Sequence, residues 1–158
     1  ARYFSETLEA ELARANRFDR PITVVMGDLD LLRNINNTYG HLAGDQVLIG
    51  IAEILKNNVR EYDVVARFGG EEYAILMPET MPEQAFERME YIRSLIEKAE
   101  FTVPTSVTAI KATISIGIAG RESHAQTASD IIHNADVGLY NAKLSGRNRS
   151  RWNDIPCR

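Results

Sequence analysis

The chain has 158 residues, of which 44% are hydrophobic and 25% are charged, as in soluble globular domains. Its 18 basic and 22 acidic residues give a net charge of −4, which argues against a protein that coats nucleic-acid polymers. The single cysteine, Cys157, cannot form an internal disulfide, and no apolar run approaches the roughly 20 residues of a membrane helix. We therefore expect a cytoplasmic domain that makes no membrane contact itself, although an upstream part of a full-length protein can still be anchored in a membrane.

Hydrophobic periodicity divides the first half of the chain into alternating helices and strands. Helices are predicted over 4–15, 31–38 and 47–59, and strands over 22–26, 64–68 and 72–77. The strand Ile22–Met26 is almost entirely apolar and β-branched, so we expect a central strand buried on both faces. Gly69 and Gly70 can adopt positive φ, so a β-hairpin is the simplest connection between the two later strands.

The second half of the chain continues the pattern. Helices are predicted over 85–96 and 131–143, a strand over 112–118, and an edge strand over 101–103. Gly146 ends the last helix. This order predicts an α/β (α+β) sandwich in which helices flank a mixed central sheet. We expect residues 1–158 to form a single domain, excised from a longer multidomain protein, with residues 152–158 as a C-terminal tail.

Acidic residues lie at the ends of two predicted strands. Asp28 and Asp30 follow the central strand, and residues two apart in a strand share a face, so the pair can hold a hard cation. Glu71 and Glu72 lie at the hairpin tip, and neighbouring strands are only about 4.8 Å apart. Carboxylates from the two places can therefore meet around Mg²⁺, which prefers oxygen ligands. The alternative is that both tips are ordinary solvated turns.

Two basic clusters are candidates for anion binding. Lys143 and Arg147 are four residues apart at the end of the last helix and can hold a polyphosphate, although basic residues also favour helix C-termini through the macrodipole. Arg60 and Asp63 lie at a helix-to-strand corner, where the alternative is a surface ion pair of little energy. The chain contains neither a Walker A loop nor a GxGxxG motif, so a P-loop or Rossmann site is not supported.

Taken together, three segments resemble the signature of the GGDEF family of diguanylate cyclases. They occur in the family's order and spacing: DLDLLRNINNTYGHLAGD over 28–45, RFGGEEY over 67–73 and ADVGLYNAKLSGRN over 135–148. The resemblance extends from Tyr3 to about Arg149. It implies a bacterial enzyme that condenses two GTP molecules into cyclic di-GMP and releases two pyrophosphates. It also implies a fold like the palm of nucleotide polymerases and class III cyclases.

The resemblance assigns residues to the metal and to the proton transfer. It implies that Asp28, Glu71 and the backbone carbonyl of Leu29 bind Mg²⁺, for which Mn²⁺ is a possible substitute. The metal would polarise phosphate and stabilise charge on the leaving pyrophosphate. Either Glu71 or Glu72 assists deprotonation of the attacking 3′-hydroxyl. Nothing in the sequence chooses between them.

The resemblance also assigns the substrate contacts. Asn36 and Asp45 would read guanine, because a carboxylate accepts hydrogen bonds from N–H groups that adenine does not offer in that pattern. The groups that would hold the triphosphate are Lys143, Arg147 and the backbone around Leu31, Leu32 and Arg33. Position 33 usually carries lysine in the family, and arginine keeps a phosphate contact with altered geometry.

Product inhibition and dimerisation follow from the same resemblance. Arg60-x-x-Asp63 matches the family's inhibitory site for cyclic di-GMP, and Arg88 is the candidate for a second arginine. Each domain would hold one GTP, so turnover needs a homodimer in which two sites face each other. An upstream segment would supply dimerisation and sensory input.

Departures from the family pattern are modest, and two other functions remain open. Leu31 and Leu32 replace common aromatics, Asn37 replaces aspartate, and Tyr73 replaces phenylalanine and adds a hydroxyl that needs a partner. One alternative is a non-catalytic module that senses cyclic di-GMP or GTP, although such modules typically lack an intact Gly-Gly-Glu-Glu tip. The other is a class III-like cyclase that makes a cyclic mononucleotide.

Overall fold

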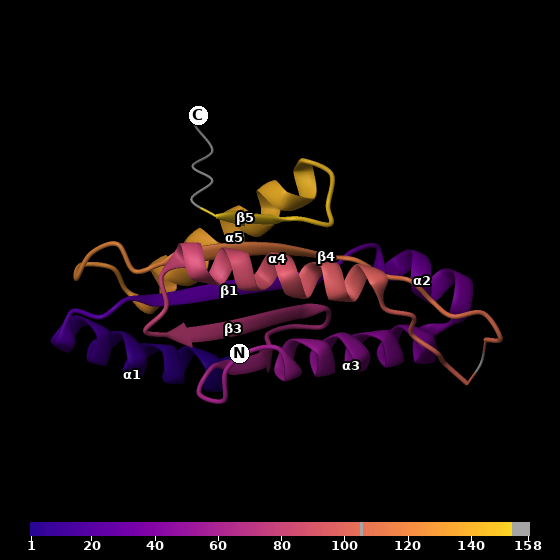
Figure 1. Ribbon diagram of the computed structural model, residues 1–158, viewed down its shortest axis with the longest axis horizontal. Helices are drawn as coiled ribbons and strands as arrows, with labels where there is room; N and C mark the ends of the chain where they lie inside the picture. The colour runs from indigo at the N-terminus through magenta and orange to yellow at the C-terminus, as the bar shows by residue number, and fades with distance from the viewer. Residues whose placement is uncertain (105, 153–158) are drawn as a thin grey trace.

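The computed structural model describes residues 1–104 and 106–152 (Figure 1). The helices are α1 (Arg2–Phe18), α2 (Leu32–Tyr39), α3 (His41–Asn57), α4 (Pro82–Lys98) and α5 (Ala128–Leu144). The strands are β1 (Ile22–Leu29), β2 (Val64–Arg67), β3 (Glu72–Pro78), β4 (Ile114–Gly120) and β5 (Ser150–Trp152). Among the helices of the described ranges, none is long and apolar enough to cross a membrane.

The strands form one sheet in the order β2-β3-β1-β4-β5. Strand β1 pairs antiparallel with β3 and β4, β2 pairs antiparallel with β3, and β5 pairs parallel with β4. The predicted mixed sheet and the β2-β3 hairpin are therefore confirmed. Because β1 is the middle strand, its last residues are flanked on both sides by other strands.

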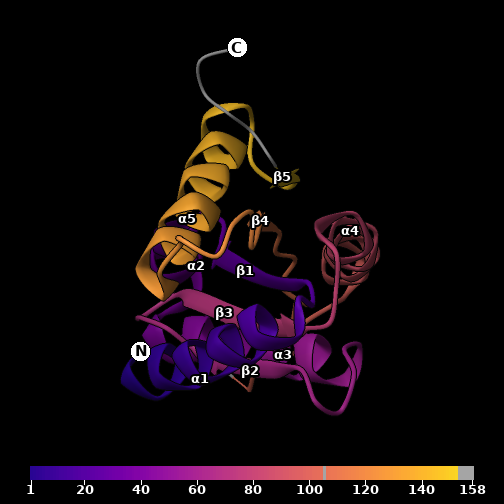
Figure 2. The same ribbon diagram turned by 90° about the vertical axis from the view of Figure 1, so that its left-hand side faces the viewer.

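Alternating side chains of β1 reach two separate cores, which explains why the whole strand is buried. Ile22, Val24 and Met26 pack with residues of α1 and α5, whereas Val25 and Leu29 pack with residues of α3 and α4. Figure 2 shows α5 and α4 on opposite sides of the strands. The predicted central strand buried on both faces is confirmed, and Asp28 falls on the face that α5 covers.

Several local predictions need correction. Helix α3 begins at His41, directly after Gly40, rather than near residue 47. Gly69 and Gly70 do not adopt positive φ. The connection between β2 and β3 is longer than a two-residue turn and is closed by a hydrogen bond from the Phe68 N–H to the Glu72 carbonyl, at 2.8 Å, so it does not require positive φ. The predicted edge strand at 101–103 is a single bridge between Phe101 and Ile110.

The C-terminal end of the sheet also differs from the prediction. Trp152 is not part of a tail, because it ends β5 and pairs with Ile118. Strand β5 has only three residues, and its pairing with β4 rather than an apolar pattern defines it. The rest of the predicted tail, residues 153–158, lies outside the described residues.

Candidate active site

The carboxylates of the two predicted tips meet at the end of β1. Asp28 is the register partner of Glu72, and the Leu29 N–H donates to the Glu71 carbonyl at 3.3 Å. The side chain of Asp28 is 8% exposed, so its charge is largely removed from water. A buried carboxylate needs a cation or hydrogen-bond donors to remain ionised.

One such cation comes from α5. Lys143 Nζ lies 2.5 Å from Asp28 Oδ2. Gly117 lets α5 approach the sheet closely, since a Cβ at this position would lie 2.0 Å from the Ala135 carbonyl oxygen. Thr127 and Asp130 begin α5 with a capping box, so the helix starts at a defined residue. Lys143 therefore faces the carboxylates rather than standing apart as a purely exposed helix-end charge.

Burial and crowded like charges raise the pKa values of the glutamates at this site. Burial and the Asp28 charge raise the pKa of Glu71, while Lys143 opposes the shift. Burial and the charges of Asp28 and Asp136 raise the pKa of Glu72. Asp136, on α5, was not predicted as a site residue, although its spacing of seven from Lys143 places both on one helix face.

The residues at this site fit a bound cation. Asp28 Oδ1 is buried and accepts no hydrogen bond within the described ranges, which leaves an acceptor for a cation. In the same ranges, no three His, Cys, Asp or Glu side chains gather as a metal site. A cation here would therefore take protein ligands from the Asp28 and Glu71 carboxylates and from a backbone carbonyl, with other oxygens completing its shell.

Asp30 does not share a cation with Asp28, contrary to the prediction from strand spacing. Its Oδ1 accepts a hydrogen bond from Ser115 Oγ at 2.6 Å. Its Oδ2 accepts hydrogen bonds from Thr113 Oγ1 at 2.8 Å and from the Asn148 N–H at 3.0 Å. Both oxygens are occupied, so Asp30 has a structural contact network of its own.

The predicted base-reading residues lie on α2 and α3. Asn36 fits closely against Gly44, because a Cβ at position 44 would lie 1.9 Å from Asn36 Oδ1. That oxygen is buried and, within the described residues, has no hydrogen-bond partner. Asp45 is exposed on the first turns of α3. The two side chains therefore present acceptors from the adjacent helices α2 and α3.

The predicted phosphate-binding groups come from two turns. Leu31, at φ 57°, is the N-cap of α2, so the first N–H groups of the helix, at Leu32 and Arg33, have no acceptor within it. Arg147 is exposed and lies beyond the end of α5, at φ 64°, rather than on the same helix face as Lys143. The expected arrangement of these two side chains along one helix is therefore wrong.

The hairpin tip is anchored on both faces of the sheet. Phe68 packs edge-on against Phe4 of α1, with ring centroids 5.8 Å apart. The Tyr73 hydroxyl donates to the Leu48 carbonyl of α3 at 2.6 Å, so its extra hydroxyl has the partner that the sequence demanded. Arg67 donates to the Gly70 carbonyl and lies over the Tyr73 ring. These contacts fix the loop that carries Glu71 and Glu72.

Arg60, Asp63 and Arg88 line one pocket of about 440 Å³. The Arg60 N–H donates to Asp63 Oδ2 at 2.8 Å, and the Arg60 guanidinium donates to Thr80 Oγ1. The Asp63 side chain is 2% exposed, and its Oδ1 lacks a partner in the described part of the chain. Thr80, which helps to hold Arg60, was not predicted, because no local pattern marks it.

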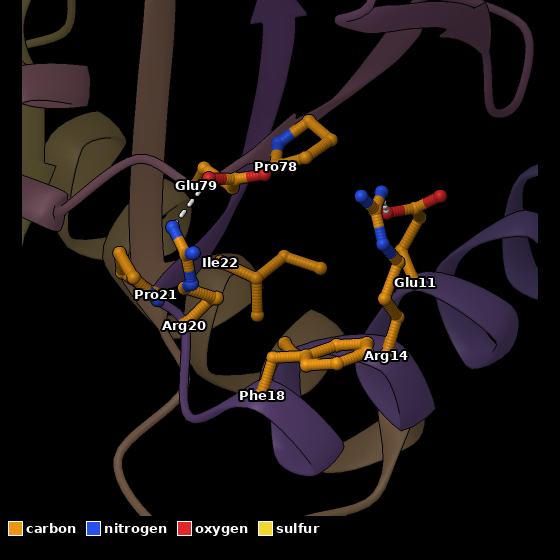
Figure 3. Close-up of a pocket in the computed structure, with 9 residues that line it drawn as sticks. Glu11, Arg14, Phe18, Arg20, Pro21, Ile22, Pro78 and Glu79 are labelled. Carbon is orange, nitrogen blue, oxygen red and sulfur yellow. Dashed lines mark hydrogen bonds and ion pairs between the residues drawn. The ribbon is translucent and has the colours of Figure 1, made fainter.

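Another pocket, of about 210 Å³, lies at the start of β1, the end of the strand away from Asp28. Figure 3 shows the residues that line it. Phe18, Pro21, Ile22 and Pro78 line its apolar part. An ion pair between Arg20 and Glu79, at 3.0 Å, lies at its edge. None of the predicted site residues lines this pocket.

Comparisons with known proteins place the chain in a family. Residues 1–149 match the family model described as "Diguanylate cyclase, GGDEF domain". The chain is 37% identical over 147 residues to the response regulator PleD of Caulobacter vibrioides, which covers 93% of the chain and 32% of PleD. The chain therefore belongs to the GGDEF-domain family, as the three sequence segments predicted. It spans about a third of the length of the curated relatives it matches.

Solved structures agree with this assignment. The active GGEEF domain of a diguanylate cyclase from Vibrio cholerae superposes with a TM-score of 0.88 at 29% identity, covering 96% of this chain and 94% of that one. The GGDEF domain of DgcB from Caulobacter crescentus, in complex with c-di-GMP, gives a TM-score of 0.90 at 27% identity, covering 94% and 87%. The predicted cyclase-like fold is confirmed, and the cyclases of this family are generally metal-dependent.

Proposed function

We propose that this chain is the catalytic domain of a diguanylate cyclase, which condenses two GTP molecules into cyclic di-GMP and releases two pyrophosphates. The observation that carries the proposal is the meeting of Asp28 with the glutamates of the hairpin tip, beside Lys143. Membership of the GGDEF family and the likeness to the Vibrio cholerae domain support it. GTP as substrate is consistent with a cytoplasmic location.

Asp28, Glu71 and the Leu29 carbonyl would hold the metal, which we propose to be Mg²⁺. When bound, Mg²⁺ neutralises charge on the phosphates and on the departing pyrophosphate. The buried Asp28 Oδ1, which accepts no hydrogen bond from the described residues, supports this set of ligands. The raised pKa of Glu71, which arises from burial and from the Asp28 charge, also supports it, because a nearby cation would favour the ionised carboxylates.

The remaining groups bind and orient GTP. Asn36 Oδ1 and the Asp45 carboxylate accept hydrogen bonds from guanine N–H groups, which favours guanine over adenine. The α2 N-terminus at Leu31, Leu32 and Arg33 faces phosphate oxygens with unpaired N–H groups and a positive dipole end. Lys143 and Arg147 add positive charge to the same triphosphate.

The reaction joins two such half-sites. The 3′-hydroxyl of one GTP loses its proton and attacks the α-phosphorus of the other, whose bond to the β-phosphate oxygen breaks as pyrophosphate leaves. We assign the proton to Glu72 rather than Glu71, because Glu71 is proposed to hold the metal; the pKa of Glu72 is also raised, by burial and by the charges of Asp28 and Asp136. Repetition with the roles exchanged closes the ring, which requires two domains facing each other in a dimer. An upstream segment is proposed to bring them together.

Product inhibition is proposed to act through the pocket of Arg60, Asp63 and Arg88. The two arginines can bind phosphate and guanine edges, and Asp63 Oδ1 can accept from guanine. The pocket is lined by residues of the α3–β2 corner, the end of β3 and α4, away from the β1 carboxylates. The c-di-GMP complex of the related DgcB domain supports a product-binding role.

The test is chromatography of the products after concentrated protein is incubated with GTP and Mg²⁺. The comparison includes Glu71→Ala, Arg60→Ala and a parallel incubation with ATP. Each protein is also fused to a dimerising coiled coil, so that inactivity cannot arise from half-sites that fail to meet. Cyclic di-GMP from the wild type, with none from Glu71→Ala and no product from ATP, is the expected result.

Two outcomes would overturn the proposal. No cyclic di-GMP from the fused wild type or the fused Arg60→Ala variant rejects catalysis, and tight cyclic di-GMP binding would then identify a sensor module. A cyclic mononucleotide as the product would identify a different cyclase reaction.

A further inference from the structure

The turn that carries Arg147 has an unusual backbone. Gly146, Arg147 and Asn148 have φ values of 128°, 64° and 50° in succession. Positive φ is uncommon for residues with a Cβ and persists where surrounding contacts hold it. The Arg147 side chain itself makes no hydrogen bond or ion pair within the described residues. The Arg147 N–H donates to the Ala142 carbonyl at 2.9 Å, and the Arg147 carbonyl accepts from Arg149 Nε at 2.9 Å, so backbone hydrogen bonds hold part of this turn.

Asn148 adds contacts that connect the turn to distant elements. Its backbone N–H donates to Asp30 Oδ2 at 3.0 Å, its Oδ1 accepts from Arg93 Nη1 at 2.9 Å, and its Nδ2 donates to Glu97 Oε2 at 2.9 Å. Asp30 follows β1, and Arg93 and Glu97 lie on α4. One residue thus ties the Arg147 turn to the central strand and to a helix on the opposite face of the sheet from α5.

The partners of Asn148 are themselves fixed. Asp30 is buried and also accepts hydrogen bonds from Thr113 and Ser115, next to and within β4. Arg93 is 17% exposed and pairs with Glu90 at 3.1 Å, while Glu90 accepts from the Ser150 N–H at 3.0 Å. The network therefore reaches β5, which directly follows the turn.

We propose that Asn148 is a positioning residue: with Asp30 and Arg93 it holds the Arg147 turn so that the guanidinium points at the triphosphate of the substrate. This inference rests on the proposed function, in which Arg147 binds phosphate. It gives a role to the hydrogen bonds that occupy both oxygens of Asp30, which lies two residues from Asp28 and does not take part in the proposed metal site.

The test measures binding without turnover. The probe is the α,β-methylene analogue of GTP with Mg²⁺, which cannot release pyrophosphate, and GMP serves as the ligand that lacks the phosphate tail. Asn148→Ala should weaken analogue binding about tenfold, the scale expected for a lost charge-assisted contact, and GMP binding less than about twofold. Asn148→Gly removes the side-chain contacts but tolerates positive φ, so it provides a folded variant for the same comparison.

A double-mutant cycle separates positioning from a structural role. If Asn148 acts through Arg147, the double variant Arg147→Ala/Asn148→Ala should bind the analogue as weakly as Arg147→Ala alone. The matched control is Asn16→Ala, because Asn16 Oδ1 accepts from the partly buried Arg121 at 3.2 Å in the same way, far from the site. That variant should lose stability and keep its affinity for the analogue.

Several results would overturn the inference. Additive losses in the double variant, equal losses for the analogue and GMP, or unchanged analogue binding by both Asn148 variants would each leave Asn148 as a merely structural residue. Failure of the wild type to bind the analogue at all would instead reject the proposed function, and the inference with it. The wild-type measurement thus distinguishes the two failures.

Discussion

The carboxylate site and the Arg60 pocket differ in how their charges are balanced. At the end of β1, like charges are crowded together, and burial and the Asp28 charge raise the pKa values of Glu71 and Glu72. In the pocket, opposite charges meet, and the buried Asp63 is held by the Arg60 backbone and side chain. The first site is therefore built to gain a cation, whereas the second is already neutralised and presents free polar edges to a ligand.

The largest expected effect is at the first site. Asp28→Asn should reduce cyclic di-GMP synthesis by about a hundredfold or more, because it removes a proposed metal ligand and the partner of Lys143. Cyclic di-GMP binding, measured by titration calorimetry, should persist, because Asp28 is not among the residues that line the Arg60 pocket. Loss of both activities together would show that the two sites are not independent.

The second effect reverses that pattern. Asp63→Asn should weaken cyclic di-GMP binding by about tenfold or more, because it removes the charge that accepts from guanine and holds Arg60. Synthesis should then continue to a higher product concentration than in the wild type, as progress curves would record. If cyclic di-GMP inhibits this variant as strongly as it inhibits the wild type, the pocket is not the inhibitory site.

The third prediction concerns the anchor of the hairpin tip. Tyr73→Phe should lower the free energy of unfolding by about 1 kcal/mol, because it removes the buried hydrogen bond to the Leu48 carbonyl. Urea denaturation monitored by circular dichroism provides the measurement. An unchanged stability would mean that the phenylalanine usual in the family packs here equally well, and that the hydroxyl adds nothing to the tip.

Much of the fold was predictable because its signals are local. The apolar strand Ile22–Met26 and the periodic helices follow directly from spacing, and so does the meeting of Asp28 with the hairpin tip. Strand β5 was missed because three residues carry no pattern, and only pairing with β4 defines it. The start of α3 was missed because His41 to Gln46 contain few apolar residues.

The role of Asp30 could not be predicted for a different reason. Strand spacing places Asp28 and Asp30 on the same face, which is what a shared cation requires. The partners of Asp30 lie 83, 85 and 118 residues away in the sequence, at Thr113, Ser115 and Asn148. Local patterns describe where a carboxylate can point, whereas distant donors decide whether its oxygens remain available.

The smallest expected effect is on the pH dependence of stability, at two carboxylates with opposite shifts. Burial raises the pKa of Asp136 above 3.8, so its contribution to stability is complete below the unfolded pKa and is lost as pH rises through the folded pKa. Glu90 is the reverse case. Although burial opposes the shift, hydrogen bonds from Arg93 and Ser150 lower its pKa, so its contribution is present above 4.5 and is lost as pH falls.

Replacing each acid by its amide separates the two signs. Asp136→Asn should raise the free energy of unfolding at pH 7, and this gain should disappear towards pH 4. Glu90→Gln should lower the free energy of unfolding at pH 7, and this loss should disappear towards pH 4. Thermal unfolding of the metal-free domain at several pH values measures both differences against the wild type. Parallel rather than opposite trends would contradict the view that burial governs the pKa of Asp136 on α5, whereas hydrogen-bond partners govern that of Glu90 on α4.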